Sequence, residues 1–143
     1  MTLDKIIAIS GKPGLFKILS HSKGRVIVES LKDKKRFPVS TLNGISALEE
    51  IAIYTYDEDV PLRKVFVTIY EKEKGKTSIN PNDNSSVLTN YFKEILPHFD
   101  DERVYTSNIK KVLKWYNDLI DAHFDFKNLK KEIEPSEKEE SKD

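Results

Sequence analysis

The hydrophobic pattern of the chain changes once, near residue 60, and this change constrains the fold more than any other feature. Before it, short β-branched or aromatic runs are bounded by turn-forming or charged residues, as is typical of strands. After it, apolar residues recur at helical spacing over three segments. The pattern predicts an α+β chain in which the strands come first and the helices second. The four strand-like runs are residues 6–9, 15–19, 26–28 and 51–56.

The strand-rich part has the turn signals of a meander. Residues 22–24 and 32–35 are predicted hairpin tips, and Lys12-Pro13-Gly14 suits a type II turn because glycine tolerates a positive φ. Ser46 and Glu49 have the spacing of a capping box, which predicts a short helix before the last strand. Four or five short, curved strands close most economically into a small SH3-like β-barrel, which we assign to residues 1–59.

The helical part is predicted as a three-helix unit over residues 60–126. Its helices are expected at 61–74, at 84–96 and from Thr106 or Ser107 to 122, each with one apolar stripe.

Residues 127–143 are almost entirely Lys, Glu, Ser and Asp, with only Leu129 and Ile133 as apolar anchors. So little apolar area does not repay the entropy of ordering. We therefore expect a frayed extension of the third helix followed by disorder, and assign 127–143 as a disordered charged tail.

Composition excludes several classes of function. The 143 residues contain no cysteine, which excludes disulfides, thiolate nucleophiles and Cys-ligated zinc. His21, His98 and His123 lie far apart without metal-ligand spacing, and His98 with Asp100 and Asp101 is predicted as a polar connector. We expect no enzymatic activity, no catalytic residues, no metal and no cofactor. Since the early apolar run is too short for a signal peptide or a membrane span, we also expect a cytoplasmic protein without membrane contact.

Charge is segregated although the net charge is zero. Between residues 12 and 36, eight basic residues face two acidic ones, whereas residues 49–59 hold five acids and no base. Basic hairpins with Phe16 and Phe37 between them could contact the phosphates of RNA or a ribonucleoprotein. The alternative is that these lysines only protect strand edges and the phenylalanines belong to the core. The candidate nucleic-acid contacts are Lys12, Lys17, Arg25, Lys34, Lys35 and Arg36.

Trp115 is the candidate for a partner interface. At 100° per residue it lies on the shoulder of the apolar stripe of the third helix, where the indole needs a cover. That cover is either another part of this chain or a partner, so a protein–protein adapter or homodimer is the alternative to RNA contact. A hydrolase would require a pocket that gathers a histidine with carboxylates. The oligomeric state is left open.

Five strings carry a family resemblance: residues 9–17, 28–31, 35–39, 103–112 and 114–117. Through them, nearly all of residues 3–122 resemble an uncharacterised family of Bacteroidota proteins known as domains of unknown function. The resemblance implies a two-part architecture and a bacterial cytoplasmic setting, and it implies no chemistry.

Overall fold

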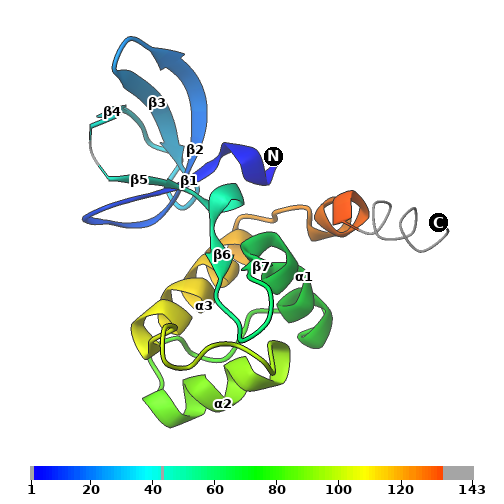
Figure 1. The fold of residues 1–143 in the computed structure, drawn as a ribbon. Helices are drawn as coiled ribbons and strands as arrows, with labels where there is room; N and C mark the ends of the chain where they lie inside the picture. The colour runs from blue at the N-terminus through cyan, green and yellow to red at the C-terminus, as the bar shows by residue number, and fades with distance from the viewer. Residues whose placement is uncertain (1, 43, 134–143) are drawn as a thin grey trace, which may run out of the picture.

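The computed structural model describes residues 2–42 and 44–133 and has an α+β architecture. An antiparallel sheet formed by the N-terminal part stands above a group of helices formed by the rest (Figure 1). The chain passes from one to the other through a short link at residues 48–53. The predicted order of strands before helices is confirmed.

The main sheet has five strands in the order β4-β3-β2-β1-β5, with antiparallel neighbours throughout. One-turn 3-10 helices stand before and after it: η1 at Leu3–Lys5 and η2 at Leu48–Glu50. The strands are β1 (Ile6–Ile9), β2 (Lys12–Ser22), β3 (Arg25–Ser30), β4 (Arg36–Ser40) and β5 (Ile45–Ala47).

The sheet does not close into the barrel expected for residues 1–59. Within the residues described, β4 and β5 are its two edges and no pairing joins them. Residues 52–53, part of the run expected to supply the last strand, form β6 (Ala52–Ile53) instead. That strand pairs with β7 (Val60–Pro61) beside the helices. Closure is absent because the strand that would provide it belongs to the other half of the molecule.

Two local turn predictions need correction. The hairpin between β1 and β2 turns at Ser10 and Gly11, while Gly14 keeps its positive φ of 88° at an irregularity inside β2. The capping box at Ser46 does not form, because Ser46 pairs with Ala8 in the sheet and η2 has no side-chain cap. The predicted tip at residues 22–24 is confirmed, since Ser22 pairs with Arg25 across it.

The three predicted helices lie close to their expected positions. They are α1 (Leu62–Lys72), α2 (Ser85–Ile95) and α3 (Thr106–Asp121).

A fourth helical segment, residues 126–133, was expected to be a frayed extension of α3 and the start of the disordered tail. The chain instead leaves α3 at Ala122, turns at His123 with a φ of 59°, and starts a new helix. Phe126 stacks on Tyr70 of α1 with ring centroids 4.9 Å apart, and Leu129 is buried. Long-range aromatic packing thus supplies the apolar contact that the local composition lacks. The rest of the tail prediction, residues 134–143, lies outside the described residues.

The apolar interior consists of two clusters. The smaller one lies on one face of the main sheet and includes Ile7, Phe16 and Val28. The larger one joins the helices to residues that precede residue 50, so the two halves share a core. These residues are Leu3, Ile6, Leu15, Leu31 and Leu48, all at most 6% exposed.

Within residues 2–42 and 44–133, no helix combines the length and the apolar character that crossing a membrane requires.

Candidate binding surfaces

The structure brings five of the six predicted basic contacts to one end of the sheet. Lys12 begins β2, and Lys34 and Lys35 form the β3–β4 turn directly before Arg36. Lys17 pairs with Glu29, which in turn pairs with Arg36. We call these five residues the basic corner.

The sixth, Arg25, lies at the opposite end of β3, paired with Ser22 and Ser40.

Two cations of the basic corner have partners within the sheet. The Arg36 Nε donates to Glu29 Oε2 at 2.9 Å, although the arginine side chain remains 67% exposed. The Lys12 ammonium lies 4.8 Å from the ring centroid of Phe37. Lys34 and Lys35 are exposed. The basic corner is therefore accessible, but part of its charge is already compensated.

The two phenylalanines considered as base-stacking platforms belong to the core of the sheet. Phe16 is 5% exposed and meets Phe37 edge-on, with ring centroids 5.6 Å apart. Phe37 packs against the smaller cluster, and the Lys12 ammonium lies over its ring. A base cannot reach the face of Phe16, so the basic corner offers contacts for phosphates and little for bases.

Lys32 and Lys114 extend the basic corner across the junction with α3, which the sequence did not indicate. Both lie near Asp118 of α3. Burial raises the pKa of Asp118, Asp121 raises it further, and the two lysines oppose this rise. The sequence could not predict this proximity, because Lys32 and Asp118 are brought together only by the packing of α3 on β2.

Trp115 lies at the margin of the shared core. It is half-buried and packs against the larger cluster, so other parts of this chain supply most of its cover.

A second surface, absent from the sequence-based candidates, forms where residues 54–56 run beside residues 98–100. The Tyr56 N–H donates to the His98 carbonyl at 2.9 Å, and the Asp100 N–H donates to the Tyr54 carbonyl at 2.9 Å. Thr55 faces inward, and this alternation turns the side chains of Tyr54 and Tyr56 outward, where they are 44% and 59% exposed. The alternation Ile53-Tyr54-Thr55-Tyr56 indicates that the two tyrosines share one side of an extended segment, but it does not indicate the pairing with residues 98–100.

Side-chain contacts hold both tyrosines in place. The Tyr56 hydroxyl donates to Asp101 Oδ1 at 2.5 Å, and this hydrogen bond raises the pKa of Tyr56 to about 12. The Arg103 guanidinium lies over Tyr54, with its central carbon 4.2 Å from the ring centroid. Arg103 Nε also donates to Asp100 Oδ2 at 2.7 Å, and this contact lowers the pKa of Asp100. We call Tyr54, Tyr56, Arg103 and the acids around them the tyrosine patch.

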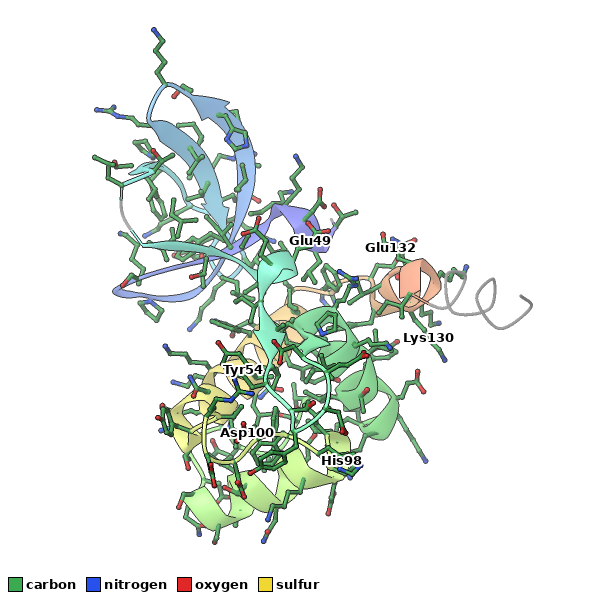
Figure 2. The ribbon with its side chains drawn as sticks, viewed as in Figure 1. Glu49, Tyr54, His98, Asp100, Lys130 and Glu132 are labelled. Atoms are coloured by element: carbon green, nitrogen blue, oxygen red, sulfur yellow. The ribbon has the colours of Figure 1, made fainter. Side chains whose placement is uncertain are left out.

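The tyrosine patch is strongly acidic. Six carboxylates occupy residues 54–59 and 98–103, against Arg103 as the one Lys or Arg of these two segments. Three of them, Asp100, Asp101 and Glu102, act electrostatically on Tyr56, and Asp59 acts on Arg103. Figure 2 shows Tyr54, Asp100 and His98 together on the helical half, away from the sheet. The carboxylates are Asp57, Glu58, Asp59, Asp100, Asp101 and Glu102.

The acids of the connector are engaged by neighbouring side chains, and two cavities of the described residues are lined without a histidine. Asp100 and Asp101 are engaged by Arg103 and Tyr56, and among the described residues no three His, Asp or Glu side chains are placed to hold a metal ion. A cavity of about 310 Å³ lies between α1, the end of α2 and residues 130–133. Another of about 450 Å³ is lined by η1, Glu49, Arg63, Leu129 and Glu132. The lining residues of these two cavities include no histidine.

Two family models match successive parts of the chain. The model of domain of unknown function DUF5606 matches residues 3–48, and that of domain of unknown function DUF6852 matches residues 51–119. A solution NMR structure of a Bacteroides vulgatus protein, from the Northeast Structural Genomics Consortium, is 38% identical with a TM-score of 0.72. The match covers 85% of this chain and 88% of that one. No curated protein matches the chain.

The chain belongs to this uncharacterised Bacteroidota family, and the two family models match it one after the other. The resemblance seen in the sequence is thereby confirmed.

Proposed function

We propose that this protein is a non-enzymatic binding module that contacts the phosphate backbone of RNA through the basic corner. The observation that carries the proposal is the convergence of Lys12, Lys34, Lys35 and Arg36 at one end of the sheet. Accessible cations at a common edge suit a polyanion, because each phosphate contact releases counterions. The binding unit would be residues 1–59, with residues 60–126 as its support.

Binding of this kind would be tolerant of sequence. Phe16 is buried and Phe37 already carries Lys12, so neither offers a free ring face for a base. Contacts limited to phosphates position a nucleic acid without reading its bases. RNA is a cytoplasmic partner in bacteria, so this function agrees with the cytoplasmic setting expected from the sequence.

We also propose that the open sheet is related to SH3-like folds. The support is its strand order, in which β2, β3 and β4 form a meander on one side of β1 and β5 pairs on the other. Folds of that kind serve many functions, so this kinship adds nothing to the argument for RNA.

The test is the salt dependence of binding to a labelled single-stranded RNA, measured by fluorescence anisotropy with the full chain. With four phosphate contacts, the logarithm of the association constant should fall linearly with the logarithm of the salt concentration, with a slope of about −3. A double variant, Lys34→Ala with Lys35→Ala, should reduce the steepness by about 1.4. The matched control is Lys93→Ala with Lys127→Ala, which removes two exposed lysines from α2 and from residues 126–133.

The control variant should bind like the natural protein. No binding at about 50 mM salt, or the same slope in both double variants, would overturn the proposal. Arg25→Ala tests the sixth predicted contact separately, and we expect no change because Arg25 lies at the other end of β3.

A further inference from the structure

We propose that the tyrosine patch is a docking surface for an arginine- or lysine-containing segment of a protein partner. This inference is independent of the proposed contact with RNA, because it concerns another surface and a partner of opposite charge.

The patch is organised before any partner arrives. Two segments more than 40 residues apart in the sequence are joined by backbone hydrogen bonds on both sides of the Thr55–Phe99 bridge. Thr55 is 4% exposed, accepts a hydrogen bond from the Asp57 N–H at 3.0 Å, and donates one to the Glu58 carbonyl at 2.6 Å. A surface held in this way loses little conformational entropy on binding.

The exposed side chains are of the kind that dominates protein interfaces. Tyrosine and arginine are enriched among the residues that contribute most to binding, because they bury a large area at a small cost in entropy. Six large apolar or aromatic side chains are exposed in the described part of the chain, and Tyr54 and Tyr56 are two of them. They stand two positions apart on the outward side of one extended segment.

Charge complementarity indicates the chemistry of the partner. Among residues 2–42 and 44–133, Arg103 is the one cation within ion-pair distance of the six carboxylates of the patch. Such a surface repels RNA and favours a cationic segment.

The patch contains an internal example of the recognition that we propose. Arg103 places its guanidinium over the ring of Tyr54 while its Nε donates to the carboxylate of Asp100. Tyr56 offers the same pair of groups beside it, an aromatic ring together with the carboxylate of Asp101, and Tyr56 is the more exposed of the two tyrosines. A partner arginine at Tyr56 would repeat the arrangement of Arg103 at Tyr54.

The basic corner and the tyrosine patch can act at the same time. Lys32, next to the basic corner, lies near Asp118, whereas the patch ends just before α3 begins at Thr106. Twelve helical positions separate Asp118 from Thr106, which corresponds to about 18 Å. Since charges are screened over about 8 Å at physiological salt, the acidic patch does not cancel the basic corner.

The experiment measures binding of labelled eight-residue peptides to the full chain by fluorescence anisotropy at low salt. The peptides alternate serine with arginine, with lysine, or with citrulline, which has the shape of arginine without its charge. We expect the arginine peptide to bind most tightly, the lysine peptide less tightly because it lacks a planar group to stack, and the citrulline peptide not at all.

Variants at Tyr56 separate the contribution of ring stacking to peptide binding from that of the negative charge of the patch. Tyr56→Ala keeps every charge and should weaken the arginine peptide about three- to tenfold, whereas Tyr56→Phe keeps the ring and should change binding by less than about twofold. Tyr105→Ala is the matched control, because Tyr105 is 64% exposed and takes part in none of the ring or cation–π contacts among the described residues. Circular dichroism of each variant checks that the fold is retained.

Equal binding of Tyr56→Ala and Tyr105→Ala would overturn the proposal, and so would binding of the citrulline peptide. The sedimentation velocity of the chain across a concentration series provides a further measurement. A self-associated species that Tyr56→Ala abolishes, without any peptide binding, would assign the patch to a second copy of this chain and would also overturn the proposal.

Discussion

The basic corner and the tyrosine patch are both charged surfaces, but they are held in different ways. The corner is made of local turns, and its side chains are positioned by one exposed ion pair and one contact of Lys12 with Phe37. The patch joins distant segments, and hydrogen bonds position its side chains: Tyr56 donates to the exposed Asp101, Arg103 donates to the buried Asp100, and the buried Thr55 donates to the Glu58 carbonyl. A loosely held cationic surface suits a flexible polyanion, whereas a fixed aromatic and acidic surface suits a partner of defined shape.

The largest effect is expected from a substitution in the shared core, which tests whether the two surfaces belong to one cooperatively folding unit. Leu48→Ala removes a side chain with no exposure from the shared core and should cost about 2–5 kcal/mol of unfolding free energy. Unfolding should remain a single transition, with Trp115 fluorescence and the amide resonances of β3 changing at the same urea concentration. Leu42→Ala is the control, since Leu42 is 94% exposed and its loss should change stability by less than about 0.5 kcal/mol. Separate transitions for the two probes would show two independent units.

The next effect tests the rigidity of the tyrosine patch. Thr55→Val keeps the size of the side chain but removes its hydrogen bonds with Asp57 and Glu58, which should cost about 1–3 kcal/mol. Thr68→Val on the exposed side of α1 is the matched control and should stay within about 0.5 kcal/mol. Urea unfolding measures both. A stable Thr55→Val protein would mean that backbone pairing alone fixes the patch.

Two carboxylates should respond to pH in opposite directions. The pKa of Asp100 is lowered by Arg103, so its ionised form stabilises the fold above the unfolded pKa of about 4, and this contribution disappears as pH falls through the folded pKa. The pKa of Asp118 is raised by burial, so its ionised form destabilises the fold at neutral pH; this penalty shrinks as the pH falls through the folded pKa and is gone below the unfolded pKa of about 4.

At pH 7, Asp100→Asn should therefore lower the urea midpoint and Asp118→Asn should raise it. Both differences should shrink as the pH is lowered from 5 toward 3. If the two variants shifted the urea midpoint in the same direction at pH 7, relative to the natural protein, this contrast between the patch and the junction would be contradicted.

The smallest effect is expected at the ion pair of the basic corner. Because Arg36 is 67% exposed, Glu29→Gln should change the unfolding free energy by only about 0–1 kcal/mol. Arg36 is already one of the four proposed phosphate contacts, so the salt slope of RNA binding should stay at about −3 while the loss of the negative charge of Glu29 strengthens binding. A slope that becomes steeper by about 0.7 would show instead that Glu29 keeps Arg36 from the RNA in the natural protein.

Local patterns explain which parts of the fold were predictable. The three helices follow directly from the spacing of their apolar residues, and the tip at residues 22–24 follows from its glycine. The helix at 126–133 was missed because its order depends on Phe126 meeting Tyr70, a contact that no local period encodes. The capping box failed for a similar reason, since pairing of Ser46 with Ala8 takes precedence over a weak local signal.

The same distinction between local and long-range contacts explains which candidate surface could be predicted from the sequence. The basic corner could be found from the sequence because its residues lie close together along the chain. The tyrosine patch could not, because it depends on the meeting of residues 54–56 with 98–100. Before that pairing is known, Asp100 and Asp101 appear as part of an ordinary polar connector. The sequence also could not reveal that Lys12 covers Phe37.

Leu48 lies at the boundary between the two family segments, since one ends at residue 48 and the other begins at residue 51. Its side chain has no exposure, and η2, which contains it, packs against η1 and β1 of one segment and against α1 of the other. Neither segment can therefore be exchanged for a foreign one without refitting this contact. Related chains should carry the two segments as an inherited pair, and a shuffled chimera of distant relatives should recover its stability through compensating changes around position 48.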